Sequence, residues 1–180
     1  MHLIKHFYYK SVKYDLLNKF FYKNTKNFPK IKKIVLNLGC NTTKITNLAI
    51  SALALELITS KKSQFTVTKK ANLLFKIRKG NPVGCKVVLK SNNIFNFLEI
   101  NSYYILPKLQ HFNNLVIKNK LNKNSLQYKI PNLLTFTELE KNYSLFHELR
   151  NLDVTIITNS SKIKETKFLM RSFQFFNTFN

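Results

Sequence analysis

Four cationic side chains are interleaved with two glycines and a proline in residues 75–87, whose sequence is FKIRKGNPVGCKV. Gly80 and Gly84 allow a positive φ or a close approach of the backbone, and Pro82 fixes φ between them. Such a turn would hold its cations at fixed spacing, and an arginine there can present a fork of donors to a phosphate or a base edge. The cations are Lys76, Arg78, Lys79 and Lys86. The pattern predicts a polyanion-binding turn; the alternative is a hairpin connection whose lysines face water.

The charge balance favours nucleic acid as the polyanion. Thirty Lys and Arg stand against eight Asp and Glu, which gives a net charge of +22 on 180 residues. No acid occurs in 16–55, 57–98 or 100–137, and 57–98 carries eight Lys and one Arg. A uniformly positive field of this kind attracts phosphate backbones, with an affinity that falls as salt rises. A hydrophobic content of 44% with sixteen Phe excludes a basic disordered tail, so we expect one domain over 1–180.

Catalytic and metal-binding patterns are missing from the sequence. Cys40 and Cys85 lie far apart without a CxxC motif, so we expect two small, reduced core residues. The four histidines are scattered, no GxxxxGK loop occurs, and the only close acids are Glu138 and Glu140, two residues apart in a segment considered as a strand. No apolar run is long enough to span a membrane, and the N-terminus has no secretory signal. We therefore expect no enzyme, no metal, no cofactor and no membrane insertion.

Hydrophobic periodicity predicts an α+β fold with a mainly antiparallel β-sheet and helices packed on one face, in a single domain. Strands are expected over 33–38, 64–68, 83–90 and 152–158. Helices are expected over 11–21, over 45–59 with Thr42 or Thr43 as cap, over 93–105 up to Pro107, and after Ser160 or Ser161. The last helix would carry Ile163, Leu169, Met170 and Phe173, and the Asn-rich segment 111–132 reads as a mobile loop with short strands. The second face of the sheet would be free for RNA.

Three segments resemble one known family. KIVLNLG at 33–39, the turn at 75–87 and RNLDVTIIT at 150–158 are similar to the fifth protein of the large ribosomal subunit, which binds 5S ribosomal RNA in the central protuberance. The likeness extends from about residue 3 to 176, and the turn is its most specific part. The glycine-rich segments of the family are replaced by the Asn-rich stretch at 111–132.

The resemblance implies a site and a set of partners. Asn37 falls in the family's LNxG motif and would contact 5S rRNA, because an amide on a sheet can read a base edge or a 2′-hydroxyl; the alternative is a turn former at a strand end. A basic loop at about 66–80 would reach peptidyl-site tRNA. Further partners would be large-subunit rRNA, neighbouring proteins of the central protuberance and, as a further candidate, the head of the small subunit. Together with the basic field, the expected RNA-binding residues are Asn37, Lys61, Lys62, Lys69, Lys70, Phe75, Lys76, Arg78, Lys79, Gly80, Lys86 and Lys90.

Composition indicates a genetic origin. Twenty-three Asn and twenty-seven Lys accompany only three Arg and three Gly, a skew toward residues with A/T-rich codons. Because the likeness begins within the first few residues, we expect no cleavable presequence. Both observations favour a mitochondrial ribosomal protein of the matrix, with a plastid as the alternative.

Two other function classes stay open. A free RNA chaperone or single-strand binder could use the many Phe and Tyr as stacking platforms. A nucleic-acid enzyme would need a carboxylate cluster, which eight acids hardly provide. Sedimentation with the large subunit would separate a ribosomal scaffold from the chaperone.

Overall fold

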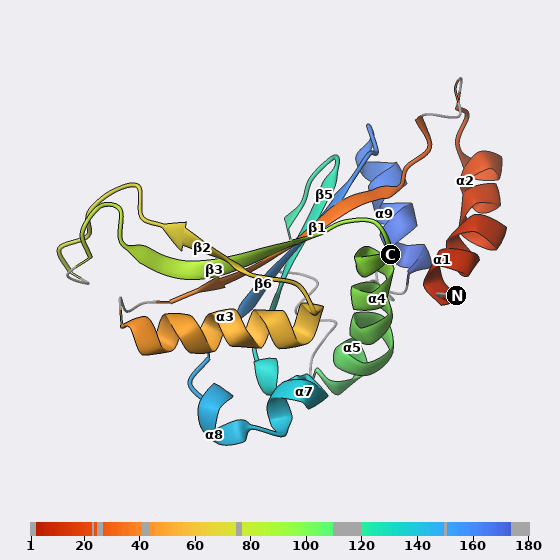
Figure 1. Cartoon of the computed structure of the whole chain (residues 1–180). Coiled ribbons are helices and arrows are strands. Elements are labelled where there is room, and N and C mark those ends of the chain that lie inside the picture. Colours follow the sequence, from red (N-terminus) through yellow and green to blue (C-terminus); the bar gives the residue numbers. More distant parts are fainter. Residues whose placement is uncertain are drawn as a thin grey trace. The chain divides into compact units, whose positions relative to one another are not determined.

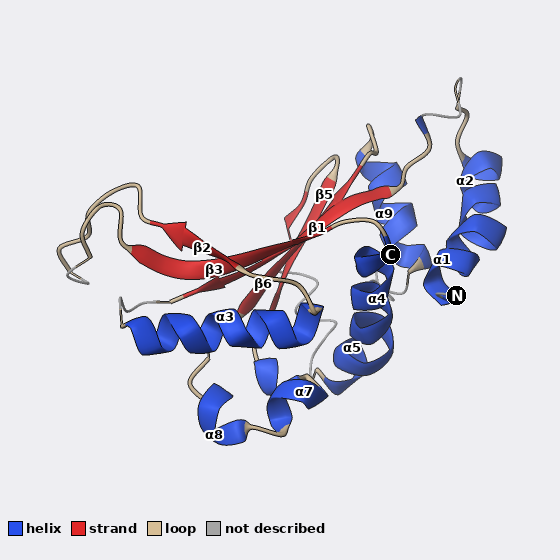
Figure 2. Ribbon diagram, in the orientation of Figure 1, coloured by secondary structure: helices blue, strands red, loops and turns tan. Residues whose placement is uncertain are grey.

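The computed structural model describes residues 3–22, 24, 27–40, 44–74, 77–109, 120–149 and 151–173 (Figures 1 and 2). Its elements are α1 (Leu3–Phe7), the π-helix η1 (Tyr8–Val12), α2 (Lys13–Lys19), β1 (Ile31–Gly39), α3 (Ile45–Thr59), β2 (Gln64–Val67), β3 (Pro82–Leu89), α4 (Asn92–Ile100), the π-helix η3 (Asn101–Ile105), α5 (Leu106–Lys108), β4 (Lys120–Leu121), β5 (Ser125–Ile130), the 3-10 helix η4 (Leu133–Thr135), α7 (Thr137–Glu140), α8 (Tyr143–Phe146), β6 (Leu152–Thr158) and α9 (Ile163–Ser172). The predicted helix over 45–59 and strand over 152–158 coincide with α3 and β6.

The strands of the described residues form one six-stranded sheet in the order β2, β3, β1, β6, β5, β4. β2 pairs with β3 and β4 with β5 in antiparallel fashion. The predicted α+β class with a mainly antiparallel sheet is confirmed. The Asn-rich segment was expected to be a mobile loop with short strands, and β4 and β5 are short strands within it. Leu126, Tyr128 and Ile130 of β5 are buried in strict alternation. His111 and the rest of 111–119 lie outside the described residues.

The chain divides into two compact units. Unit 1 comprises Met1–Ile34, Leu89–Tyr128 and Thr155–Asn180, and unit 2 comprises Val35–Val88 and Lys129–Val154. Each unit combines segments that are distant in the sequence, so neither could be read from the chain as a continuous domain. The single RNA-binding domain over 1–180 stays a prediction.

In unit 1, the N-terminal helices bury one side chain in every four. Ile4, Tyr8, Val12 and Leu16 are buried, a spacing that drifts by about 40° per step on a regular α-helix. The wider π-turn η1 compensates for this drift and keeps the four side chains on one side. The helix predicted over 11–21 therefore begins earlier and also ends earlier, at Lys19, and Phe21 after it is exposed.

A second π-turn follows α4 in the same unit. Asn101 on η3 is fully buried, and its side-chain amide donates a hydrogen bond to the hydroxyl of Tyr128. Burial of Tyr128 raises the pKa of its phenol. Pro107 was expected to stop the helix, but it lies in the first turn of α5, where no intrahelical N–H donor is required.

The start of α9 differs from the expected serine cap. The helix begins after Lys162, which makes no side-chain cap, while the backbone N–H of Ser161 donates to Glu165 Oε2 at 3.4 Å. Ser160 is buried instead, and its hydroxyl hydrogen-bonds to Thr158 Oγ1 at 2.7 Å. Leu169, Met170 and Phe173 are core residues as predicted, whereas Ile163 is 47% exposed.

In unit 2, α3 packs on one face of β1 and β3, as Figure 2 shows. Ser51 of α3 is fully buried, and its hydroxyl lies 3.4 Å from the thiol of Cys85 on β3 and 3.4 Å from the thiol of Cys40. Burial raises the pKa of the Cys85 thiol. Both cysteines are free; Cys85 is a core residue as predicted, whereas Cys40 is only half-buried. The N-cap of α3 is Lys44, without a side-chain cap, and the predicted caps Thr42 and Thr43 lie outside the described residues.

The C-terminal end of α3 is held by hydrogen bonds that Glu56 accepts. Ser60 adopts a left-handed conformation with φ of 50°, and its N–H donates to the Glu56 carbonyl at 2.7 Å. The Glu56 carboxylate accepts from the N–H of Ser63 at 2.9 Å and from its hydroxyl at 3.0 Å. These bonds lower the pKa of Glu56, and the charge of Lys62 contributes in the same direction. The turn that carries Lys61 and Lys62 is therefore anchored to the helix.

Gly84 allows β3 to approach β1 closely. A Cβ at this position would lie 2.8 Å from the backbone oxygen of Leu38 and 3.0 Å from Thr66 Oγ1. The backbone oxygen cannot move aside as a flexible side chain can, so we expect Gly84→Ala to destabilise the protein by about 1–3 kcal/mol in urea unfolding. Gly39→Ala is the matched control, because nothing lies within 4 Å of its Cβ position. Equal losses in the two variants would show that the close approach at Gly84 is not the cause.

Glu56 makes the stability dependent on acid pH. Because its pKa is lowered from the ordinary 4.5, its ionised form stabilises the fold above that pH, and this contribution is lost as the pH falls through the lower folded-state value. Glu56→Gln should therefore unfold at a lower temperature than the wild type at pH 7, and the difference should shrink below about pH 4.5. The control is Glu138→Gln, an exposed carboxylate on α7. A difference for Glu56→Gln that is constant with pH would contradict this account.

Candidate nucleic-acid interface

The strands of unit 2 have one buried face and one accessible face. On β1, Leu36 and Leu38 are buried whereas Asn37 between them is partly exposed. On β3, Cys85 and Val87 are buried whereas Lys86 is partly exposed. Because α3 lies against the buried face, the side chains of the alternate positions form what we call the open face of the sheet.

A row of polar side chains crosses the open face. Gln64 on β2 pairs with Lys86 on β3. The N–H of Cys40 donates to the carbonyl of Val83 at 2.8 Å, and an antiparallel ladder continued from that pair places Lys86 opposite Asn37. An ammonium group thus lies between two side-chain amides, a combination that can bind a phosphate and read base edges or 2′-hydroxyls. Gln64 is the member that sequence reasoning missed: the strand register shifts between Thr66 and Val67, so counting outward from the turn would pair Gln64 with Cys85 and not with Lys86.

Two glycines lie next to this row. Thr66 pairs with Gly84, and the same register places Gly84 opposite Gly39, whose Cα would be 3.4 Å from a Cβ on Gly84. Nothing lies within 4 Å of the Cβ position of Gly39. Gly84 is itself buried, so the open space beside the Gln64, Lys86 and Asn37 row lies over Gly39, where a nucleotide can approach the backbone closely.

The loop between β2 and β3 is braced by hydrogen bonds. The N–H of Gly80 donates to the Thr68 carbonyl at 3.0 Å, and the Thr68 hydroxyl donates to the Arg78 carbonyl at 2.8 Å. Gly80 has a φ of +88°, which is the first of the two roles predicted for the glycines of this turn. Gly84 has the second role, because its backbone lies close to that of Leu38. Figure 1 shows the loop extending past the strand ends. Lys69, Lys70, Arg78 and Lys79 are all exposed on it.

The remaining predicted residues belong to neither the row nor the loop. Lys61 is exposed, and its ammonium donates to the carbonyl of Val88 at 3.0 Å, while Lys62 is exposed beside it. Lys90 is exposed after β3, in unit 1. Phe75 and Lys76 lie outside the described residues. The structure therefore groups Asn37 with Lys86, and Lys69, Lys70, Arg78, Lys79 and Gly80 with one another.

Four of the five acids of unit 2 belong to its helices or follow them. Glu56 is on α3, Glu138 and Glu140 are on α7, and Glu148 follows α8; Glu138 and Glu140 were discussed as strand residues, but their segment is helical. Asp153 on β6 is the exception, and Lys129 lies 3.4 Å from it. The positive charge of the open face and the loop is thus barely offset by nearby carboxylates.

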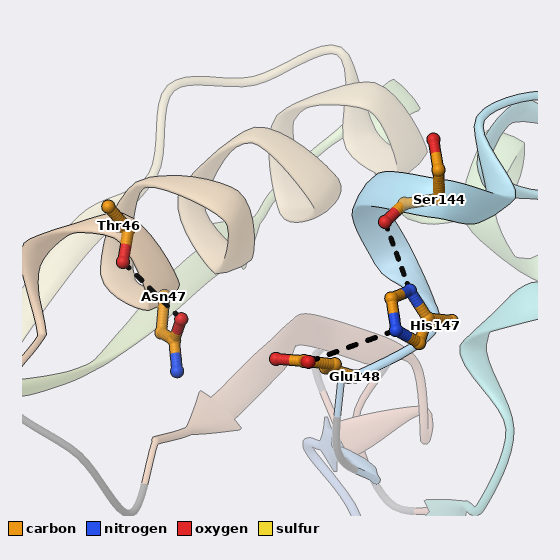
Figure 3. A network of polar contacts seen from close by, with 5 residues as sticks. All are labelled: Thr46, Asn47, Ser144, His147 and Glu148. Carbon is orange, nitrogen blue, oxygen red and sulfur yellow. Dashed lines mark hydrogen bonds and ion pairs between the residues drawn. The ribbon is translucent and has the colours of Figure 1, made fainter.

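One histidine contacts a carboxylate beside the first turn of α3. His147 Nε2 lies 3.8 Å from Glu148 Oε1, and Nδ1 lies 3.0 Å from the carbonyl of Ser144 (Figure 3). The figure also shows the Thr46 hydroxyl donating to Asn47 Oδ1 at 3.5 Å. The histidine contacts the backbone carbonyl of Ser144 and not its hydroxyl. These residues therefore do not form the pair of nucleophile and general base that a hydrolase uses.

Two features are absent from the part of the chain that the structure describes. It contains no cluster of three or more His, Cys, Asp or Glu residues able to hold a metal ion. None of its helices combines the length and the apolar character that crossing a membrane requires.

Comparison with known proteins gives the family. The pattern of the C-terminal part of the ribosomal L5 family matches residues 82–176. The chain is 35% identical to the large ribosomal subunit protein uL5m of Reclinomonas americana over 176 residues, which are 97% of this chain and 97% of that protein. It is also 35% identical to the large ribosomal subunit protein uL5 of Ehrlichia ruminantium (strain Welgevonden) over 175 residues, 95% of this chain and 97% of that protein. The chain therefore belongs to the L5 family of ribosomal proteins, which are structural constituents of the large subunit and not enzymes.

Proposed function

We propose that this protein binds 5S rRNA and large-subunit rRNA in the central protuberance through the open face of unit 2. The observation that carries the proposal is the row of Gln64, Lys86 and Asn37 beside the open space over Gly39. It combines a phosphate-binding cation, two amides able to read RNA and a backbone that a nucleotide can approach. Family membership supports a ribosomal scaffold over a free RNA chaperone.

The second part of the proposal concerns the loop between β2 and β3. Its four described cations, Lys69, Lys70, Arg78 and Lys79, are exposed and lie in a segment without acids. A basic loop that extends past the sheet can reach a second RNA while the sheet holds the first. We assign this loop to contact with peptidyl-site tRNA.

The proposed setting is the mitochondrial ribosome. The Reclinomonas americana relative is a uL5m protein, and the Asn and Lys excess of this chain is of the kind that A/T-rich genomes produce. The Ehrlichia ruminantium relative is equally identical, so sequence similarity alone does not separate mitochondrion from bacterium. Neighbouring proteins of the central protuberance would be the protein partners.

The open face can be tested by a salt series of 5S rRNA binding. Lys86→Ala should lower the slope of log K against log salt by about 1, because one phosphate contact is lost. Asn37→Ala should weaken binding by about tenfold at every salt concentration with the slope unchanged, because an uncharged hydrogen bond is lost. Filter binding with 5S rRNA, and with an unrelated RNA of equal length, measures both effects.

The matched control for Lys86 is Lys141→Ala, an exposed cation that follows α7. It should leave the affinity within about twofold of the wild type, as expected for a solvated surface charge. Equal losses for Lys86→Ala and Lys141→Ala would show that binding depends on bulk charge, and the open face would then not be a specific site.

The loop can be tested on assembled particles. Lys69→Ala/Lys70→Ala should enter the large subunit at wild-type levels, since both side chains are exposed, yet retain less peptidyl-site tRNA. The loss should be greatest at low salt, where screening is weakest. Lys162→Ala/Lys164→Ala is the control, because these two exposed lysines at the start of α9 lie outside the loop and outside the predicted RNA-binding set. If the loop variant retains tRNA normally but dissociates from the subunit, the loop binds ribosomal RNA instead.

A further inference from the structure

The loop between β2 and β3 ends in two adjacent exposed leucines. Leu73 is 92% exposed and Leu74 is 91% exposed. Single exposed apolar side chains are common on proteins, but two consecutive leucines that contact almost nothing in their own fold are costly to leave in water. The charge pattern of the sequence did not single out these leucines, because two adjacent leucines are usually buried in the hydrophobic core.

The backbone holds these leucines outward in a defined turn. Asn72 and Ile77 pair through two backbone hydrogen bonds of 2.8 and 2.9 Å. The Asn72 side chain accepts the N–H of Leu74 at 3.1 Å, as in an Asx turn. Ile77 is buried, so the apolar residue that anchors the turn differs from the two that face solvent. The apolar tip, Leu73 and Leu74, thus follows directly a residue whose backbone and side chain are both hydrogen-bonded.

Cations flank the apolar tip on both strands of the hairpin. Lys69 and Lys70 precede it, Arg78 and Lys79 follow it, and no acid lies between residues 57 and 98. An apolar pair among exposed cations matches a surface that alternates anionic groups with flat apolar faces. RNA has this character, with phosphates beside ribose and base faces, so charge complementarity favours RNA over a protein partner.

We propose that Leu73 and Leu74 pack against ribose or base surfaces of the tRNA whose phosphates the flanking cations hold. The inference rests on the proposed contact of this loop with peptidyl-site tRNA, and it adds a component of affinity that salt does not screen. The cations set the salt dependence of binding, and the leucines contribute through the apolar surface they bury.

The test compares tRNA affinity of purified large subunits over a salt series. Leu73→Ser/Leu74→Ser should weaken tRNA binding by about tenfold at every salt concentration with an unchanged slope, because apolar burial is lost and no charge changes. Leu73→Met/Leu74→Met should restore most of the affinity. The fold should be unaffected, since both side chains are more than nine-tenths exposed.

Two control variants separate this inference from the proposal on which it rests, the contact of the loop with peptidyl-site tRNA. Leu3→Ser/Ile45→Ser removes two other exposed apolar side chains, 71% and 82% exposed, and should bind tRNA as the wild type does. Lys69→Ala/Lys70→Ala should reduce the slope of the logarithm of tRNA affinity against the logarithm of salt concentration, because cations are lost. If this lysine variant loses tRNA while the serine variant of the tip does not, the loop contacts tRNA and the inference about the leucines is wrong.

Other outcomes also decide the question. If neither the lysine nor the serine variant changes tRNA affinity, the proposed tRNA contact fails and the inference fails with it. If the serine variant retains tRNA but its particles lack a neighbouring protein by mass spectrometry, the tip binds protein and the inference is overturned. A changed slope in the serine variant would overturn it too, since that would indicate displaced cations.

Discussion

The close approach of β3 to β1 at Gly84 is the constraint on which the accessible surface of unit 2 depends. The Leu38 oxygen occupies the space that a Cβ would need, and the facing Gly39 adds no side chain. On the other side of the same strands, Ser51 of α3 lies between Cys40 and Cys85. One face is therefore closed by tight packing and the other is left free for Gln64, Lys86 and Asn37, so that a single strand arrangement produces both the core and the interface.

Charge is separated between the layers of unit 2 in a way that suits a polyanion. Four of its five acids belong to helices or their ends, and one of these, Glu56, is used to anchor the Lys61 and Lys62 turn. Buried apolar side chains stabilise the fold, so the surplus of cations is available at the surface. A net charge of +22 opposes compact folding through self-repulsion, and neutralisation by RNA would relieve it.

The loop between β2 and β3 combines the two kinds of contact that nucleic-acid recognition needs. Its cations provide long-range attraction that falls with salt, whereas a fixed turn presents uncharged groups at short range. The braces at Thr68 and Asn72 matter because an ordered loop loses less conformational entropy on binding than a floppy one.

The sequence by itself determined the fold class, most strands, α3 and the basic character of the interface. Period-two alternation in β6 and the helical period of α3 are strong local signals, and charge needs no structure to be counted. The sequence-based prediction failed where distant packing overrides local preference: the four-residue burial spacing requires the π-turn η1, and Pro107 is tolerated in a first turn. Only the tertiary structure placed Gln64 beside Lys86, assigned different roles to Gly80 and Gly84, and showed Leu73 and Leu74 in solvent. These facts depend on strand register and on burial by residues far along the chain, which no local pattern encodes.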